Sequence, residues 1–131
     1  MKNFKVIEVS IPKLKNGYLT DYRTVRFDNK EDSWSVECFR GGHDISVNDK
    51  VEVSVRSMRD CNPMSLTREG WNYYEGYVCV SSNADIDDGI LYEFHKEGDD
   101  SLNKPYSIIW GRATEKFEVG DSYVFCYKKV E

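Results

Sequence analysis

Histidine side chains are the first groups to consider for metal or acid-base chemistry, and their spacing here matches no known ligand pattern. His43 and His95 are the only histidines, and neither has a cysteine, histidine or carboxylate at the CxxC or HExxH spacing of zinc ligands. We expect His43, beside Gly42, to be a turn residue and His95 to be a structural histidine at the end of a strand. The sequence therefore predicts no zinc site.

Carboxylates and glycines likewise show no catalytic or cofactor-binding motif. Asp85, Asp87 and Asp88 resemble a calcium loop only in composition, because an EF-hand also needs a glutamate at its twelfth position and flanking helices. We interpret them as solvated charge. No GxSxG element marks a nucleophile, and no glycine run has the spacing of a phosphate-binding loop. We expect a protein that is not an enzyme and holds no cofactor, although a triad assembled only in space stays open.

The cysteines are better explained as small core residues than as disulfides. Three of the four fall within predicted strands, where a thiol packs like a small apolar side chain; the four are Cys38, Cys61, Cys79 and Cys126. Lys5 and Glu8 interrupt the N-terminal segment, which therefore lacks the apolar core of a signal peptide. We expect an intracellular protein with reduced thiols and no membrane segment. Two disulfides in an oxidising compartment are the alternative.

Aromatic side chains crowd the second half of the chain, and some of them must be exposed. They could stack nucleic-acid bases, with Arg23, Arg26 and Arg112 adding cationic contacts, or they could anchor a protein interface. The chain has 18 Lys and Arg against 23 Asp and Glu, a formal net charge of −5. Because nucleic-acid binding depends on neutralising phosphates, this acidity favours the protein interface. The strand of Tyr73 and Tyr77 is one candidate surface.

Trp110 and Arg112 are the other candidate partner-binding residues. They flank Gly111, where we expect a backbone bend, at the end of the segment YSIIW. A large aromatic beside a guanidinium is the composition enriched in interface anchors. We predict that at least one of the two faces a partner. The alternative is that Trp110 continues a core face with Ile108, since the two share strand parity.

The elements that must position these side chains are β-strands. From Val51 to Arg56, apolar and polar residues alternate with the two-residue period of a strand that buries one face. The pattern recurs at FKVIEV from Phe4, YRTVRF from Tyr22, WSVECF from Trp34, NYYEGYV from Asn72, ILYEFH from Ile90, YSIIW from Tyr106 and SYVFCYKKV from Ser122. We predict an all-β fold with little helix: one OB-like antiparallel barrel of about eight strands, forming a single domain over residues 1–131.

Three local predictions accompany this fold. Residues 57–70 are too irregular for a strand and too interrupted for a good helix, so we expect a long exposed loop there. Residues 81–89 should form a second, acidic loop, and Asn48-Asp49 a turn. Trp34 should lie in the core, on one strand face with Val36 and Cys38.

Taken in order, these strands resemble the small OB-fold subunit shared by the eukaryotic nuclear RNA polymerases, the eighth in the subunit naming. The resemblance covers most of the chain and rests on order and spacing, not on one short motif. It is carried by FKVIEV at Phe4; Tyr22, Val25 and Arg26; Ile45, Val47 and Asp49 before VEVSVRSM; NYYEGYV over Asn72 to Val78; and FEVGDSYVFCYKKV. The chain departs from the family in lacking its Gly-Gly-Leu-Leu element and in having a shorter central loop.

The resemblance implies a barrel of two OB motifs without catalytic residues or cofactor, docked on the largest polymerase subunit. The partners would be the large RNA polymerase subunits, nucleic acid would be met only within the complex, and the protein would be nuclear. No small-molecule substrate is implied. Two other functions stay open: a stand-alone OB-type binder of single-stranded nucleic acid, and a small β-barrel adaptor or inhibitor.

Overall fold

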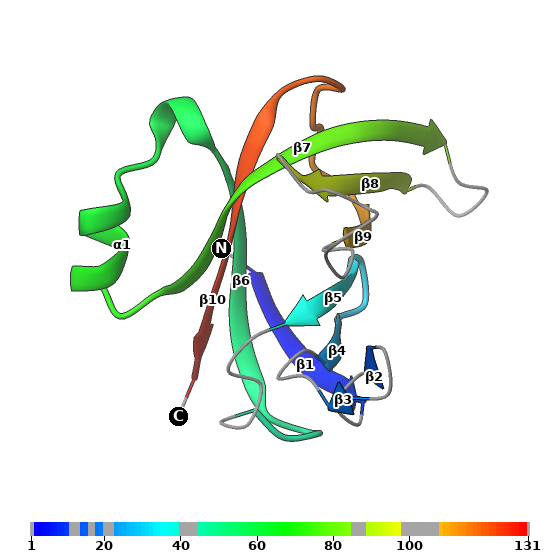
Figure 1. The fold of residues 1–131 in the computed structure, drawn as a ribbon, viewed down its shortest axis with the longest axis vertical. Coiled ribbons are helices and arrows are strands. Elements are labelled where there is room, and N and C mark those ends of the chain that lie inside the picture. The colour runs from blue at the N-terminus through cyan, green and yellow to red at the C-terminus, as the bar shows by residue number, and fades with distance from the viewer. Residues whose placement is uncertain are drawn as a thin grey trace.

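The computed structural model describes residues 2–10, 14–15, 18–19, 23–39, 45–84, 89–97 and 108–130. Its strands are β1 (Lys2–Val9), β2 (Leu14–Lys15), β3 (Tyr18–Leu19), β4 (Arg23–Asp28), β5 (Ser33–Phe39), β6 (Lys50–Ser57), β7 (Asn72–Ala84), β8 (Ile90–Lys96), β9 (Ile108–Ala113) and β10 (Ser122–Lys129). Eight of them close into an antiparallel barrel in the order β1-β4-β5-β9-β8-β7-β10-β6, and β2 pairs with β3 (Figure 1). The predicted all-β barrel with little helix is confirmed.

The alternating segments of the sequence form the barrel strands, and their apolar positions point inward. In β6, for example, Val51 and Val53 are buried, while Glu52 between them is partly exposed. The turn before β6 lies where it was predicted: Asn48 has a positive φ of 78°, and an Asp49 carboxylate oxygen accepts the Ser46 N–H at 2.9 Å. The turn therefore sets the point at which the chain enters β6.

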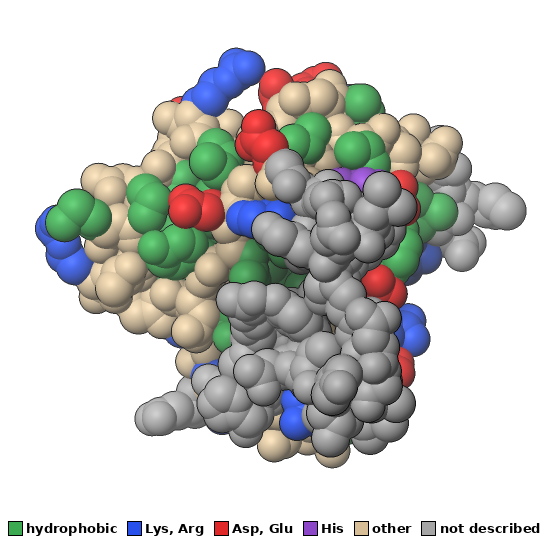
Figure 2. Space-filling view, in the orientation of Figure 1, with side chains coloured by type: hydrophobic (Ala, Val, Ile, Leu, Met, Phe, Trp, Pro, Cys, Tyr) green, Lys and Arg blue, Asp and Glu red, His purple; other side chains and the backbone are tan. Residues whose placement is uncertain are grey.

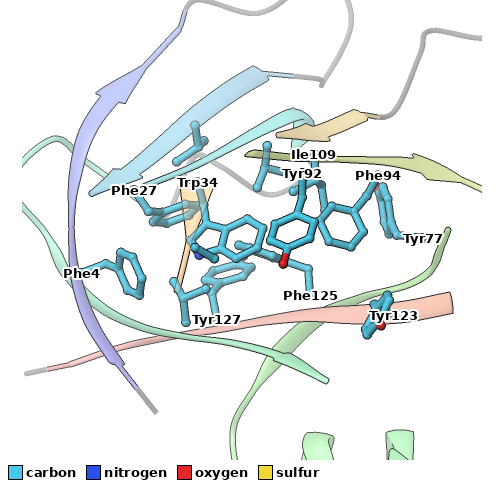
Figure 3. Close-up of a cluster of buried hydrophobic side chains, with 14 of the residues drawn as sticks. Phe4, Phe27, Trp34, Tyr77, Tyr92, Phe94, Ile109, Tyr123, Phe125 and Tyr127 are labelled. Carbon is cyan, nitrogen blue, oxygen red and sulfur yellow. The ribbon is translucent and has the colours of Figure 1, made fainter. Parts of the chain in front are cut away.

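Aromatic side chains fill the barrel interior (Figure 3). Trp34 of β5 is 3% exposed, and its ring centroid lies 5.9 or 6.0 Å from those of Phe94, Phe117 and Phe125. Most of these contacts are tilted or edge-to-face, the arrangements that aromatic quadrupoles favour. The prediction that Trp34 and Val36 lie in the core is confirmed; the side chain of Cys38 is outside the described residues.

Gly111 of β9 leaves the space that Trp34 occupies. The two residues are register partners across β5 and β9, and both face the interior. A Cβ atom on Gly111 would lie 2.3 Å from two carbon atoms of the indole, a distance at which one group must move. The bend expected at Gly111 is wrong, because β9 pairs through it with both neighbours and without a register shift.

The polar groups inside the barrel are hydrogen-bonded. The Tyr92 hydroxyl donates to the Glu115 carbonyl at 3.0 Å and accepts the Phe117 N–H at 3.2 Å. The buried Asp32 carboxylate accepts the Thr114 N–H at 3.1 Å. Because buried polar groups are costly when unpaired, these bonds fix the segment after β9 onto the barrel.

The long exposed loop expected at residues 57–70 is wrong. This segment forms a short 3-10 helix, η2 (Met58–Asp60), and an α-helix, α1 (Pro63–Arg68), which projects from one side of the barrel (Figure 1). The Asn62 side chain accepts the Met64 N–H at 3.0 Å, and Pro63 occupies the first helical position. Both features are favourable at a helix start.

A second, smaller core lies beneath α1, outside the barrel. Leu66 and Trp71 pack on Val124 and Cys126, the outward residues of β10, so that β10 is buried on both faces from residue 123 to 127. The Lys128 ammonium lies 4.8 Å from the Trp71 ring centroid, a cation-π distance. Hydrophobic side chains are also visible on the surface over α1, on the left of Figure 2.

The acidic loop expected at residues 81–89 is wrong for residues 81–84, which are part of a strand. β7 continues to Ala84, and its residues 81–84 pair with β8. Asp85, Asp87 and Asp88 lie outside the described residues, as does His43.

The contact between Trp34 and Gly111 can be tested by a double-mutant cycle. We expect Trp34→Ala to lower the free energy of unfolding by about 3–5 kcal/mol, because it leaves a cavity. Gly111→Ala should lower it by about 1–3 kcal/mol or more through overpacking. In the Trp34→Ala background, the same glycine substitution should cost less than about 1 kcal/mol, since the clash is gone. Urea unfolding measures all four proteins, and additive losses would contradict the contact.

The second core can be tested through the reactivity of Cys126. Burial raises the pKa of its thiol to about 12, so the thiol stays protonated and unreactive near pH 8. Leu66→Ala should lower the free energy of unfolding by about 2–5 kcal/mol and expose Cys126 to solvent. The pKa of the Cys126 thiol should then fall toward its usual value, and its alkylation should become faster. Mass spectrometry locates the alkylated cysteine.

Met64→Ala is the matched control for this experiment, because Met64 belongs to the same helix but is exposed. It should change the free energy of unfolding by less than about 0.5 kcal/mol and leave Cys126 protected. Equal effects of the two substitutions would show that α1 does not cover β10.

Candidate protein-interaction surface

The described part of the barrel holds no cluster suited to metal chemistry. Among the described residues, no three His, Cys, Asp or Glu side chains group together as metal ligands would. No described helix has the length and apolar character needed to cross a membrane. Since side chains fill the barrel interior, the residues open to a ligand or partner are those on its outer surface.

The outer surface of β8 and β9 brings together two of the predicted partner-binding residues. Three cross-strand pairs point outward there: Leu91 with Arg112, Glu93 with Trp110, and His95 with Ile108. We call these six residues the β8–β9 face. Directly opposed side chains on one face of a sheet lie close enough to interact, so the six form one continuous surface.

Trp110 is held on this face by a carboxylate. Its side chain is 39% exposed, and its Nε1–H donates to Glu93 Oε1 at 2.8 Å. The other carboxylate oxygen, Glu93 Oε2, lies 3.4 Å from His95 Nε2. The indole thus presents apolar surface to solvent while its polar end is already satisfied, a property of aromatic residues at interfaces.

The alternative in which Trp110 continues the core face is wrong. Trp110 and Ile108 do share one face of β9, as their parity requires, but that face points outward. The inward residues of β9 are Ile109, Gly111 and Ala113, all buried. Contact of Trp110 or Arg112 with a partner stays a prediction.

Arg112 lies across the start of β8. A Cβ atom on Gly89 would be 2.7 Å from Arg112 Cγ, so the aliphatic part of the arginine occupies the space beside that glycine. Its cross-strand neighbour Leu91 is 45% exposed. The arginine stem and the leucine therefore add apolar area next to Trp110, with a guanidinium at the edge.

Tyr73 and Tyr77 do not form a shared surface. Tyr77 is 4% exposed and belongs to the barrel core, whereas Tyr73 packs against the second core beneath α1. The cause is an irregularity at Gly76, which has a φ of 76°: Tyr77 pairs with inward Tyr123, but Tyr73 pairs with outward Cys126. The extra residue therefore places the two tyrosines on opposite faces of β7.

Sequence reasoning missed Leu91 and Glu93 as members of the surface. The signal was available, because ILYEFH places Leu91, Glu93 and His95 on one face by simple alternation. What the sequence lacked was the pairing of β8 with β9, which brings Glu93 opposite Trp110.

The chemistry open to the β8–β9 face is recognition. It offers an exposed ring, aliphatic area and a guanidinium, whereas its histidine and glutamate already contact one another. No protein-family model matches the chain, and no curated protein matches it either.

Trp110 should dominate collisional quenching of tryptophan fluorescence. Trp34 and Trp71 are 3% and 5% exposed, so acrylamide reaches mainly the third indole. We expect Trp110→Phe to remove most of the quenchable emission and to change the free energy of unfolding by less than about 0.5 kcal/mol. Glu93→Ala, which deletes the indole's hydrogen-bond acceptor, should raise the quenching constant. Quenching unchanged in Trp110→Phe would contradict the outward orientation.

Proposed function

We propose that this protein is a noncatalytic, architectural subunit of a DNA-directed RNA polymerase, which docks on the largest subunit and supports transcription. The observation that carries the docking role is the β8–β9 face, where Trp110 is fixed by Glu93 and flanked by Arg112 and Leu91. Aromatic and arginine side chains dominate the binding energy of most protein interfaces, which makes this face a suitable anchor.

The choice of polymerase as the partner rests on the resemblance in strand order. Its first and last segments, FKVIEV and FEVGDSYVFCYKKV, contribute β1 and β10 to a closed eight-stranded barrel, the architecture that the resemblance implies. The proposal also implies a nuclear location and contact with nucleic acid only inside the assembly.

A protein partner accounts for the β8–β9 face better than single-stranded nucleic acid does. The indole N–H of Trp110 is bonded to the Glu93 carboxylate, so a negative charge lies beside the ring on which a base would have to stack. A nearby carboxylate repels the phosphate backbone, whose neutralisation supplies most of the affinity of such binders.

Co-purification tests the proposal. The double variant Trp110→Ala with Arg112→Ala should reduce recovery of the large polymerase subunits with the tagged protein from its native cell by about tenfold or more, since loss of one anchor residue typically costs over 1 kcal/mol. Circular dichroism and thermal unfolding should show that the variant stays folded. Quantitative mass spectrometry of the bound subunits gives the measurement.

Val47→Ala serves as the matched control, because Val47 is exposed in the turn before β6, away from β8 and β9 in the barrel order. It should leave recovery unchanged. Absence of polymerase subunits from the wild-type purification at low salt would overturn the proposal. Unchanged recovery with the folded double variant would show that docking uses another surface.

A further inference from the structure

A groove lies on the side of the barrel opposite the β8–β9 face. In the strand order, β1 is the strand farthest from β8. The groove, about 690 Å³ in volume, runs along β1 between the end of β4 and the start of β6. Val130, which follows β10, also lines it. The Val130 N–H donates to the Lys50 carbonyl at 2.9 Å, which fixes the last described residue against this wall.

The groove combines apolar surface with lysines. Ile7 and Val130, 41% and 36% exposed, contribute aliphatic side chains. Lys5, Lys30 and Lys50 also line it and are exposed. A ligand that fits must therefore offer both apolar and anionic groups.

The local charge is opposite in sign to that of the whole chain. The described residues that line the groove include three lysines and one carboxylate, Asp28, although acids outnumber bases in the sequence. Lys5 stands directly opposite Lys50 in the β1–β6 register, which is a pair of like charges. It also stands directly opposite Asp28 in the β1–β4 register, and this pair of opposite charges offsets part of the repulsion. Within the described part of the chain, none of the three ammonium groups forms an ion pair. An anion placed between Lys5 and Lys50 would relieve their repulsion.

We infer that this groove binds an acidic peptide segment that carries aliphatic side chains. The carboxylates of such a segment would lie between the lysines, and its aliphatic groups would pack on Ile7 and Val130. The inference comes from the groove alone and does not depend on the polymerase assignment.

An acidic peptide fits these residues better than nucleic acid does. Base stacking needs an exposed ring, but the aromatic residue at the groove, Phe4, is 4% exposed with its side chain in the barrel core. Among the described residues that line the groove there is no arginine, the residue best suited to bidentate phosphate contacts. Apolar walls favour aliphatic side chains over a sugar-phosphate backbone.

The experiment uses the full chain and a short fluorescein-labelled peptide of Asp and Glu residues with two central leucines. Fluorescence anisotropy at low salt should show saturable binding that weakens as salt is added. Replacing the two leucines by alanine should weaken binding, because the aliphatic contacts are lost. Amide chemical-shift changes in an NMR titration should fall on β1, the end of β4 and the start of β6.

Matched variants locate the site. Lys5→Gln with Lys50→Gln should weaken peptide binding by about tenfold or more while leaving the fold intact, since it removes both opposed charges. Ile7→Gln should abolish the preference for the leucine peptide over the alanine peptide. Lys116→Gln, an exposed lysine outside the groove, should have no effect.

Three outcomes would overturn the inference: no peptide binding at low salt, binding unchanged in the Lys5→Gln and Lys50→Gln variant, or tighter binding of a single-stranded oligonucleotide that displaces the peptide. The last outcome would make the groove a polyanion site. Because no polymerase is present, failure here leaves the co-purification test of the proposed function untouched.

Discussion

The packing of Trp34 against Gly111 is the constraint on which the rest of this barrel depends. An eight-stranded barrel has an interior just wide enough to be filled by side chains, and here an indole lies near its centre. A ring of that size fits only if the facing strand carries no side chain at the register position, and β9 supplies Gly111 there. Because side chains fill the interior, a ligand or partner has to bind at the outer surface of the barrel.

The same contact determines what the surface presents. Because Gly111 must face inward, its neighbours Trp110 and Arg112 must face outward, and the β8 register then brings Glu93 to the indole N–H. β10 follows the same alternation with a different result. Its outward residues, Val124 and Cys126, are apolar and are covered by the α1 segment. On one side of the barrel the fold thus buries its outer apolar residues within the chain, and on the β8–β9 side an aromatic stays exposed.

Most strands were predictable from the sequence because they bury one face, and burial of one face produces the alternation seen at Val51 and Val53. β10 is the exception, since it is buried on both faces over residues 123–127. α1 was not predictable, since Leu66 is its single buried residue and a helix with one core contact has no periodicity to detect. Tyr77 was misplaced because Gly76 inserts an extra residue into β7. Trp110 could be proposed as a partner-binding residue because an aromatic beside an arginine is typical of interfaces. Its hydrogen bond to Glu93 could not be predicted, because it depends on the pairing of β8 with β9, and local sequence patterns do not show which strands pair.

The positions of the two candidate surfaces also limit how they can influence each other. The β8–β9 face and the groove along β1 lie on opposite sides of a barrel whose interior is filled with side chains, and they share no residue. Direct contact between two ligands therefore cannot couple the two surfaces, and any coupling would have to pass through a change in the arrangement of the barrel itself. A partner that contacts both surfaces would gain affinity through multivalency without such a change.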